Sequence, residues 1–297
     1  MSCPSYVLIT PARNEAALIE GTIRSMISQT AQPLRWVIVS DGSTDGTDEI
    51  VRRYQGGREW LVLLRMPERK TRDFAAKVRA FDAGFAAVKD LDFDVIGNLD
   101  ADVTFAPDYM EYLVGQFAHS PSLGVAGTHY TEGDFHSYRD SYINQNHVNG
   151  QIQLFRRQCY EDIGGYVPIE GGGIDWVAVT TARMKGWTTY SFSERTFEHH
   201  RKMGTAGSSE LRARFHYGCK DYFLGGHPLW QVFRSTFQIA KKPYLLGGVC
   251  LFAGYAWSWL QGRKRAVSPE LMAFHRGEQM ARLGRMLSRN RDHPPPP

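Results

Sequence analysis

The sequence predicts an α/β fold with a mostly parallel sheet flanked by helices. Two features of its N-terminal third support this prediction. Short apolar segments rich in β-branched residues alternate with longer amphipathic segments of helical period, which is the pattern of strand–helix–strand units. In addition, a polar cluster follows directly after three of the apolar segments. Because ligands bind at the carboxyl ends of the strands in such sheets, these clusters also predict where a site lies.

The order of the elements follows from apolar runs and the turn signals that end them. Pro11 closes the first apolar run, and the Gly-, Asp- and Ser-rich segment 41–46 ends the second, since these residues favour turns. Residues 124–198 mix short strands and turns, and we interpret them as the second half of the same domain. The expected elements are strands at 6–10, 36–40, 61–64 and 94–99, and helices from about Asn14, from Thr47, at 74–88 and at 175–185.

Composition limits the class of protein. The chain has 297 residues, of which 42% are hydrophobic and 12% aromatic, enough to bury one sizeable core. The four cysteines lie far apart and form no Cys-x-x-Cys pair, which argues against a zinc site or a disulfide scaffold and suits a reducing compartment. The N-terminus lacks a basic segment ahead of an apolar run, so we expect no secretory signal and a cytoplasmic location. The cysteines are Cys3, Cys159, Cys219 and Cys250.

The net charge of +4 is concentrated near the C-terminus. From Gln261 onward eight Lys and Arg residues stand against three Asp and Glu residues, and eight minus three gives +5. The preceding apolar run 244–260 carries Trp257 and Trp259 and has cations on both sides. It is shorter than the roughly 20 residues that a spanning helix needs, but aromatic residues and cations suit a membrane interface. The alternative is a buried hairpin or helix of the soluble core.

These features predict two regions. We expect residues 1–235 to hold the site, and residues 236–297 to form a helical, membrane-associating region that ends in a disordered proline tail. The helix of this region is expected to begin near Ser268 and to reach about Arg289 with a basic face. The expected partner is therefore an anionic membrane surface, at the inner face of the cell membrane, and not a nucleic acid.

Asp100 and Asp102 are the strongest candidates for chemistry. They follow the expected strand at 94–99, with Ala101 between them. Mg²⁺ and Mn²⁺ prefer hard oxygen ligands, and they usually take one or two carboxylates together with phosphate oxygens from a substrate. Such a cation offsets the charge that builds on a leaving diphosphate. An Asp-x-Asp pair alone is a weak signal, and its position at the end of a strand is what favours a metal site.

Two further charged groups have both a functional and a structural interpretation. Asp41 ends the second expected strand, where its carboxylate can accept from a nucleobase or a ribose hydroxyl. The structural alternative is a turn or N-cap role shared with Ser43 or Asp45. Lys77 and Arg79 lie on the helix before the acidic pair, where a cation can meet phosphate or simply face solvent.

The later part of the sequence adds a candidate base and a candidate ligand. Asp175 follows the glycine run 171–173 at the start of a helix, where it can remove a proton from an attacking hydroxyl or serve as an N-cap. His199 and His200 precede two cations, and adjacent residues of an extended strand face opposite sides. We expect His200 to complete a metal site with Asp102 and Asp100, and Arg201 or Lys202 to hold diphosphate oxygens.

The common nucleotide and hydrolase motifs are absent from the sequence. It contains no Gly-x-x-x-x-Gly-Lys-Ser/Thr phosphate loop, no Gly-x-Ser-x-Gly and no His-Glu-x-x-His. These absences argue against the usual ATPases, serine hydrolases and zinc proteases.

Taken together, the segments resemble the family 2 glycosyltransferases of the GT-A fold, which is Rossmann-like. In order, they are Val-Leu-Ile-Thr-Pro-Ala-Arg-Asn-Glu at 7–15, Val-Ile-Val-Ser-Asp-Gly-Ser-Thr-Asp-Gly at 37–46, the segment 77–84, Asn-Leu-Asp-Ala-Asp at 98–102 and Gly-Gly-Ile-Asp-Trp at 172–176. The resemblance covers about two thirds of the chain and implies an inverting transferase that uses a nucleoside-diphosphate sugar with Mg²⁺ or Mn²⁺.

The resemblance also implies roles for individual residues. Asp100, Ala101 and Asp102 would contact ribose, diphosphate and metal, and Asp175 would be the base. Lys77 and Arg201 are expected to contact the donor phosphates. The residues expected around the nucleoside are Pro11, Arg13, Glu15 and Asp41.

The sequence departs from the family pattern at two positions. Asp82 lies in a segment where the family commonly carries Asn, and Ile174 precedes Asp175 where an acidic residue is usual. The Gln-x-x-Arg-Trp signature of processive polysaccharide synthases is absent. We therefore expect addition of one sugar to a lipid-linked or growing surface-glycan acceptor.

Two alternatives stay open at this point. A nucleotidyltransferase also uses a nucleotide, a metal and paired acids, but it normally needs a glycine-rich loop after the first strand, and Thr-Pro-Ala-Arg-Asn-Glu at 10–15 contains no glycine. A catalytically inactive sugar-nucleotide scaffold is the other alternative, and the presence of both Asp102 and Asp175 argues against it.

Overall fold

The computed structural model describes residues 3–68, 75–137, 145–169, 172–201, 210–240 and 243–289. The chain divides into two compact units, Met1–Arg201 and Lys202–Pro297. The boundary expected after residue 235 falls within helix α9 (Pro228–Ile239), and a functional division at that point stays a prediction. Phe74, Gly171, Lys202 and the proline tail, all named in the sequence predictions, lie outside the described residues.

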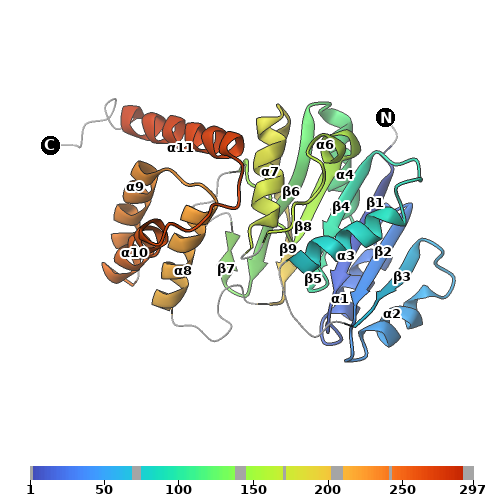
Figure 1. The fold of residues 1–297 in the computed structure, drawn as a ribbon. Coiled ribbons are helices and arrows are strands. Elements are labelled where there is room, and N and C mark those ends of the chain that lie inside the picture. The colour runs from blue at the N-terminus through green and yellow to red at the C-terminus, as the bar shows by residue number, and fades with distance from the viewer. Residues whose placement is uncertain are drawn as a thin grey trace. The chain divides into compact units, whose positions relative to one another are not determined.

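The first half of the first unit is a parallel sheet whose order confirms the predicted strand–helix alternation (Figure 1). Its strands pair in the order β3–β2–β1–β4, all parallel. Their sequences are continuous apolar runs because helices cover both faces of such a sheet. The elements are β1 (Tyr6–Ala12), α1 (Ile19–Ile27), β2 (Arg35–Asp41), α2 (Thr47–Gln55), β3 (Leu61–Met66), α3 (Ala75–Ala86) and β4 (Val95–Leu99).

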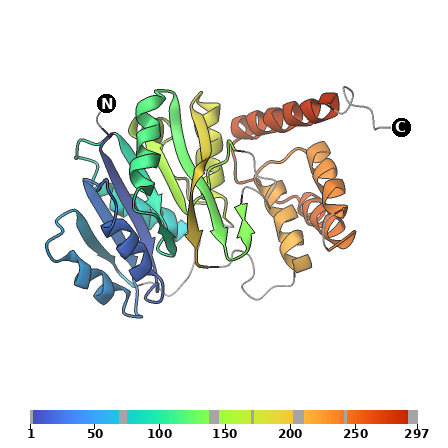
Figure 2. The same cartoon turned by 180° about the vertical axis from the view of Figure 1, so that it is seen from behind.

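The second half of this unit continues the same sheet with mixed pairing (Figure 2). Antiparallel β8 sits between β4 and β6, and β9 pairs parallel with β6 but antiparallel with β5. The described sheet is therefore mixed, and its all-parallel half, β3–β2–β1–β4, is the half that was predicted from the sequence. The elements are β5 (Val103–Phe105), α4 (Tyr109–His119), β6 (Leu123–Glu132), β7 (Phe135–His136), β8 (Ile152–Arg156), α6 (Arg157–Asp162), α7 (Ile174–Met184) and β9 (Thr188–His199).

Close packing of α3 on the sheet depends on a glycine. A Cβ added to Gly84 would lie 2.5 Å from Ile9 Cγ2 and 3.0 Å from Val39 Cγ2, so only glycine lets the helix approach β1 and β2 this closely. The position of α3 in turn sets the position of Lys77, which lies on the same helix.

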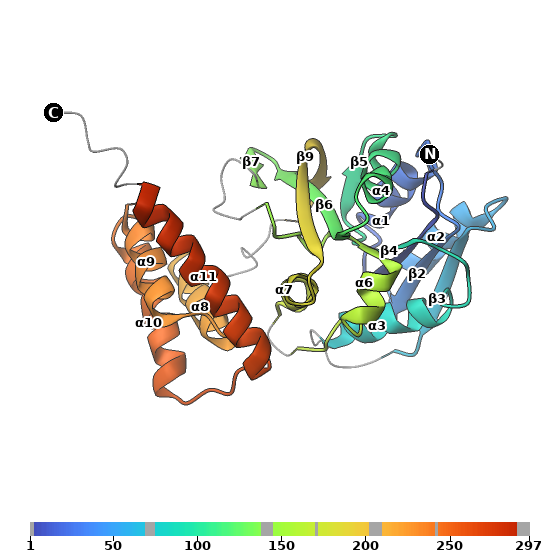
Figure 3. The same cartoon turned by 90° about the horizontal axis from the view of Figure 1, so that it is seen from above.

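The second unit consists, in its described part, of four helices (Figure 3). Helix α10 packs against α8 and α9. The predicted apolar run and the predicted helix from Ser268 are confirmed as α10 and α11. Among the described residues, no helix is both long and apolar enough to cross a lipid bilayer. The elements are α8 (Glu210–Phe223), α9 (Pro228–Ile239), α10 (Leu246–Leu260) and α11 (Pro269–Arg289).

Candidate functional site

A pocket of about 480 Å³ opens at the carboxyl ends of β1, β2 and β4. Every residue that the family resemblance implied for nucleotide-sugar binding lines it, whereas Arg79 does not, and Lys202 lies outside the described residues. Because the parallel strands end at one edge of the sheet, clusters that are far apart in the chain meet there. The lining residues are Pro11, Ala12, Arg13, Glu15, Asp41, Ala76, Lys77, Ala80, Asp100, Ala101, Asp102, Ile174 and Arg201.

The loop after β1 is held against the loop after β2. The backbone N–H of Asn14 donates to Ser43 Oγ at 3.1 Å, and Asn14 Oδ1 accepts from the backbone N–H of Thr44 at 2.9 Å. Asn14 adopts φ of 55°, a left-handed conformation that Asn tolerates better than most residues. This pairing positions Arg13 and Glu15, which flank Asn14, at the pocket wall.

Asp45 takes the turn role that the sequence left open among three residues, and the N-cap of α2 is Gly46. Asp45 Oδ1 accepts from the backbone N–H of Thr47 at 3.1 Å, at the first turn of α2, and its Oδ2 accepts from the backbone N–H of Ala16 at 3.0 Å. Burial raises the pKa of Asp45, but the hydrogen bonds from Thr47 and Ala16 outweigh it, so the pKa lies below its usual value. Asp41 is left to face the pocket.

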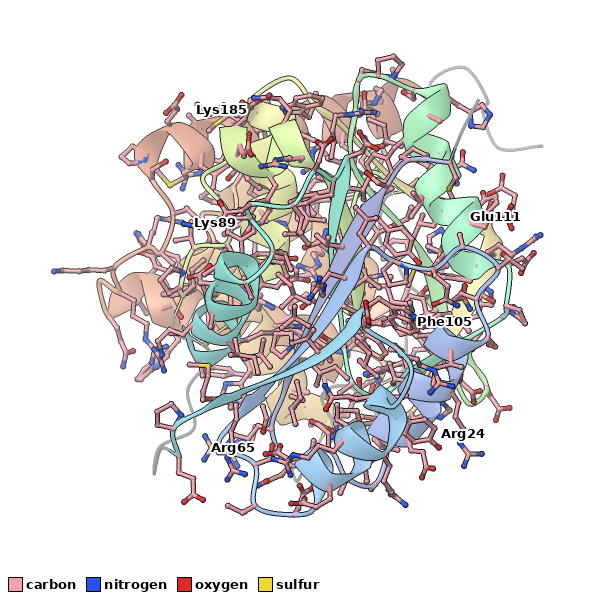
Figure 4. All side chains as sticks on the ribbon, turned by 90° about the vertical axis from the view of Figure 1, so that its right-hand side faces the viewer. Arg24, Arg65, Lys89, Phe105, Glu111 and Lys185 are labelled. Atoms are coloured by element: carbon pink, nitrogen blue, oxygen red, sulfur yellow. The ribbon has the colours of Figure 1, made fainter. Side chains whose placement is uncertain are left out.

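Arg65 supports the same loop from the neighbouring strand. It lies near the end of β3, close to α2 (Figure 4), and its Nη1 lies 2.8 Å from Oδ2 of the buried Asp48. A buried carboxylate without a cationic partner is unfavourable. Arg65 therefore lets α2 begin with Asp48 inside, which keeps the segment before it in place.

Asp100 is held by two side chains. Lys77 Nζ lies 2.6 Å from Asp100 Oδ1, and Asn98 Nδ2 donates to the same oxygen at 2.9 Å. Asn98 also donates to the backbone carbonyl of Gly150 at 2.6 Å. Burial alone would lower the pKa of Lys77, but Asp100, Asp175 and Asp102 raise it above its usual value. Lys77 is therefore a cation at neutral pH, placed by the acidic pair itself.

Asp102 faces two cationic groups. Arg201 Nε lies 3.5 Å from Asp102 Oδ2, and the same guanidinium pairs with Glu15. Burial would raise the pKa of Asp102, but hydrogen bonding and charge from His199, together with Arg201 and Lys77, hold it below its usual value. Arg201 thus bridges two carboxylates across the pocket.

The histidine expected to face the acidic pair needs correction. Nε2 of His199, not of His200, lies 3.5 Å from Asp102 Oδ1, while Nε2 of His200 pairs with Thr104 Oγ1 at 2.8 Å. The two rings diverge because neighbouring residues at the end of an extended strand point to opposite sides. His200 still contributes through its backbone N–H, which donates to the carbonyl of Asp102 at 2.9 Å.

A further residue of this cluster was missed in the sequence. Glu132, at the end of β6, accepts a hydrogen bond of 2.7 Å from His199 Nδ1. The parallel pairing of β6 with β9 brings the two residues together, and no local motif marks Glu132. Burial alone would lower the pKa of His199, but the carboxylates of Asp102 and Glu132 raise it.

Asp175 lies in the first turn of α7 and is not its N-cap. The N-cap is Gly173, with φ of 104°, so the capping alternative raised by the sequence does not apply to Asp175. A Cβ on Gly150 would come within 2.9 Å of Asp175 Cβ. Gly150 therefore places Asp175 beside the Asn98–Asp100 pair, and the preceding Ile174 lines the pocket.

The donor set near Asp102 suits a hard divalent cation. Carboxylate oxygens, such as those of Asp102 and Asp100, are the protein ligands that Mg²⁺ and Mn²⁺ prefer. Among the described residues, no group of three or more His, Cys, Asp or Glu side chains is arranged as a complete metal site. A cation at Asp102 therefore fits only with additional oxygens from a substrate or from water, which is the usual situation for Mg²⁺.

Comparisons with known proteins agree with this geometry. A poly-β-1,6-N-acetyl-D-glucosamine synthase of Staphylococcus aureus is 26% identical over 112 residues, covering 38% of this chain and 25% of that protein. Glycosyltransferase AglE of Haloferax volcanii is 26% identical over 197 residues, covering 60% of this chain and 62% of that protein. The chain thus spans about a quarter of the length of the synthase that it matches.

Among solved structures, the fold is similar to that of mannosyltransferase PcManGT from Pyrobaculum calidifontis, determined in complex with GDP-Man and Mn²⁺. The TM-score is 0.60 at 21% identity, over 97% of this chain and 81% of that one. The sequence model of the family described as glycosyl transferase family 2 matches residues 7–168. Because this match covers more than half of the chain and the whole of the parallel sheet, the protein is a glycosyltransferase that belongs to glycosyl transferase family 2.

Proposed function

We propose that this glycosyltransferase moves one sugar, with inversion, from a nucleoside-diphosphate sugar to a hydroxyl group of a lipid-linked or growing surface-glycan acceptor, using Mg²⁺ or Mn²⁺. One observation carries the proposal. The residues that the family resemblance implies for the donor line a single pocket, in which Asp100 pairs with the side chain of Lys77 and Asp102 with that of Arg201. Such alternation of charge suits a diphosphate held by cations beside a metal held by carboxylates.

The nucleoside is assigned to the part of the pocket formed by the loops after β1 and β2. Asp41 is buried at the end of β2, where its carboxylate can accept from an imide N–H or a ribose hydroxyl. Pro11, Arg13 and Glu15 also line the pocket. Hydrogen bonds accepted by Asn14 Oδ1 and Asp45 Oδ2 fix both loops, so the wall is preorganised and binding loses little conformational entropy.

The diphosphate is assigned to Lys77 and Arg201. In the ligand-free geometry Arg201 pairs with Glu15 and Asp102. A planar guanidinium binds phosphate oxygens in the same bidentate way as it binds carboxylates. Binding of the donor would therefore exchange the carboxylate partners of Arg201 for phosphate oxygens and free Asp102.

Asp102 is the principal proposed metal ligand, with Asp100 as a second carboxylate and His199 in place of His200 as the candidate nitrogen. When bound, the cation would neutralise charge on the leaving diphosphate. PcManGT binds GDP-Man and Mn²⁺ in a similar fold, which is why Mn²⁺ is the first metal to test.

Asp175 is the proposed general base. It would take the proton of the acceptor hydroxyl as that oxygen forms its bond to the anomeric carbon. The bond from the anomeric carbon to the diphosphate breaks on the opposite face, and the electron pair leaves with the nucleoside diphosphate. Asp175 lies close enough to raise the pKa of Lys77, which supports a place beside the diphosphate.

The acceptor is assigned by chemistry and by similarity. The S. aureus relative is named as a polysaccharide synthase, which supports a glycan hydroxyl as the acceptor. The apolar and basic features of the C-terminal region support work at the inner face of the cell membrane, on an acceptor held there.

The test is a thermal-shift panel of UDP, GDP, CDP and dTDP sugars with Mn²⁺. A donor at about a hundred times its Kd stabilises the folded state by about 2.7 kcal/mol, a shift of several degrees. We expect one nucleotide class to give this shift, Asp102→Asn to abolish it, and the exposed Asp90→Asn to retain it. Release of nucleoside diphosphate during turnover identifies transfer of the sugar. Pyrophosphate release, or the absence of any donor-dependent shift, contradicts the proposal.

A further inference from the structure

Helix α10 turns its small residues inward. Gly254 and Gly218 lie where helices α10 and α8 touch, so closely that a Cβ on Gly254 would lie 2.0 Å from the carbonyl oxygen of Phe215. Gly248 approaches α9 in the same way, with a Cβ position 2.4 Å from the carbonyl oxygen of Ser235. Close approach of backbones through small residues is typical of helices that pack within lipid, where large apolar side chains gain nothing by facing another helix.

Apart from the buried Leu251 and Tyr255, the same helix turns its large apolar residues outward. Val249, Phe252 and Trp257 are about half exposed, and Trp259 and Leu260 are exposed by 65% and 72%. In water, an amphipathic helix of a soluble protein directs such residues to the core. An exposed apolar face such as that of α10 is therefore unusual for a protein whose whole surface is in contact with water.

Helix α9 shows the same inversion. Gln231 and Ser235 are its buried residues, and Ser235 Oγ has no hydrogen-bond partner among the described residues. Leu229, Val232 and Ile239 are exposed instead, and their spacing of three and seven places them along one side of the helix. The polar side of α9 thus packs inside the unit and its apolar side faces outward.

The connection between the two helices continues this surface. Tyr244, Leu245 and Leu246 are all more than half exposed. The backbone N–H of Leu245 donates to the carbonyl of Ile239 at 3.1 Å, which joins the exposed end of α9 to the start of α10. We call the exposed apolar residues of α9, of 244–246 and of α10 the outer apolar surface.

Cations lie at one end of this surface. Arg263 and Lys264 follow α10 and are exposed. The third cation of the triplet, Arg265, is not available, because its guanidinium stacks on the ring of Tyr222 at 4.1 Å and donates to the carbonyl of that residue. The charge next to Trp259 and Leu260 is therefore that of two cations.

Two arginines of the basic face expected on α11 contact other residues of the same unit. Arg276 donates to the carbonyl of Gly225 at 3.0 Å, and Arg282 lies over the ring of Trp230 at 5.5 Å. The interaction of this unit with a membrane would consequently rest more on apolar burial than on charge.

From this inverted packing we infer that the outer apolar surface docks into one leaflet of a lipid bilayer, as a monotopic hairpin that enters the membrane without crossing it. At 1.5 Å per residue, the 12 residues of α9 and the 15 of α10 extend about 18 and 22 Å, less than the roughly 30 Å of hydrocarbon. Helices lying in the interface bury their apolar side by about 5–10 Å. Exposed tryptophans next to cations suit that depth, because both prefer the headgroup level.

This inference rests on the proposed function in one respect. The docked surface would hold the enzyme at the membrane, where a lipid-linked acceptor would lie. The experiment is flotation of the full chain with phosphatidylcholine vesicles, with and without phosphatidylglycerol. We expect binding to both kinds of vesicle, with the anionic lipid strengthening it on the order of tenfold for two exposed cations at low salt. High salt should remove that gain and leave binding to the neutral vesicles.

The decisive variant combines Trp257→Gln, Trp259→Gln and Leu260→Gln. These side chains are exposed, so the unit should still fold, while vesicle partitioning should fall on the order of a hundredfold. The matched control combines Leu34→Gln, Val167→Gln and Tyr217→Gln, three large apolar side chains that are similarly exposed elsewhere. The control should partition like the unaltered chain.

Several outcomes would overturn the inference. They are equal flotation of the decisive variant and the control, binding that needs anionic lipid and disappears in salt, or no binding at all. Light scattering adds another: a dimer that the decisive variant dissociates, without vesicle binding, assigns the surface to a second copy of the chain. The donor thermal shift is measured on the same samples. Absence of the donor-dependent thermal shift would contradict the proposed function. Failure of the full chain to float with vesicles, while that thermal shift is retained, would contradict only the membrane inference.

Discussion

The ring of His199 lies between two carboxylates, donating from Nδ1 to Glu132 Oε1 at 2.7 Å and directing Nε2 toward Asp102 Oδ1 at 3.5 Å. A carboxylate that accepts from one ring nitrogen fixes the orientation of the imidazole and makes the other nitrogen a better ligand. Glu132 is therefore a positioning residue for the proposed metal site, which it need not touch.

Replacement of Glu132 should weaken metal binding without removing a ligand. We expect Glu132→Ala to raise the Kd for Mn²⁺ by about 10–100-fold, measured with the donor nucleotide present from the paramagnetic resonance signal of free Mn²⁺. Glu132→Gln keeps an acceptor but loses the charge, so its effect should be smaller. Asn98 and Lys77 are unchanged in both variants, and donor binding without metal should stay the same.

His200 supplies the matched control for this prediction. Its ring pairs with Thr104, so His200→Gln should leave the Mn²⁺ affinity within about twofold, while His199→Gln should weaken it at least as much as Glu132→Ala. The reverse order of the two histidine variants would restore His200 as the ligand that the sequence suggested.

Replacement of Asp175 should lower the catalytic rate without weakening donor binding. If this residue removes the proton of the acceptor hydroxyl, Asp175→Asn should lower kcat by about 10²–10⁴-fold. The Kd for the donor, measured by titration with Mn²⁺, should change little, because the pocket wall is formed by Ile174 and not by Asp175. A variant with lost donor binding and an unchanged single-turnover rate would instead assign Asp175 to the donor.

The parallel half of the fold was predictable because its signals are local. Each of β1, β2 and β4 is a continuous apolar run, and the polar cluster that follows each run is part of the site. A strand end and the few residues after it are adjacent in sequence, so one pattern reports both the fold and the donor pocket.

The second half was not predictable in the same way, because it depends on pairing between distant strands. Glu132 meets His199 only through the register of β6 on β9, which shifts at Thr128 and His129. A shift of one residue exchanges the two faces of a strand. The choice between His199 and His200 depends on that register, and the sequence of neither strand reports it.

Helix α9 shows a third situation. It was not among the helices expected from the sequence, and its pattern of apolar and polar residues does not report which side lies inside. Gln231 and Ser235 are buried and Leu229 is exposed, the opposite of the arrangement that the pattern alone predicts for a soluble helix.

Asp45 should give a pH-dependent contribution to stability. Its folded-state pKa lies below the usual value, since hydrogen bonds from Thr47 and Ala16 outweigh burial. A group with a depressed pKa stabilises the fold at pH values above its unfolded pKa, about 3.9 for Asp, and this contribution is lost as the pH falls through the folded pKa. We expect Asp45→Ala to cost about 1 kcal/mol at neutral pH, as is typical for the loss of intramolecular hydrogen bonds.

The measurement is urea unfolding of the unaltered chain and of Asp45→Ala at several pH values. The difference between their free energies of unfolding should be constant from neutral pH down to about pH 4 and shrink in more acidic solution. Asp90→Ala is the control, because Asp90 is exposed and its side chain makes no hydrogen bond within the described residues. A difference for Asp45→Ala that grows as the pH falls would contradict the depressed pKa.

Gly84 and Gly115 form a matched pair for testing how α3 is placed. A Cβ at Gly84 would meet Ile9 at 2.5 Å, whereas none of the described atoms, apart from chain neighbours and its own helix backbone, lies within 4 Å of one at Gly115 in α4. Overpacking costs about 1–3 kcal/mol, and Ala gains at most about 1 kcal/mol over Gly in a helix. Gly84→Ala should therefore destabilise the protein, and Gly115→Ala should stabilise it by about 0.5–1 kcal/mol.

The pair also connects packing with the site. Displacement of α3 by Gly84→Ala moves Lys77 relative to Asp100, which now lies 2.6 Å from it, so the Kd for the donor should rise together with the loss of stability. Gly115→Ala should leave the donor Kd unchanged. Chemical unfolding and donor titration of the two variants test this prediction. If Gly84→Ala is as stable as Gly115→Ala, the close approach of α3 to β1 and β2 is not what holds Lys77 in place.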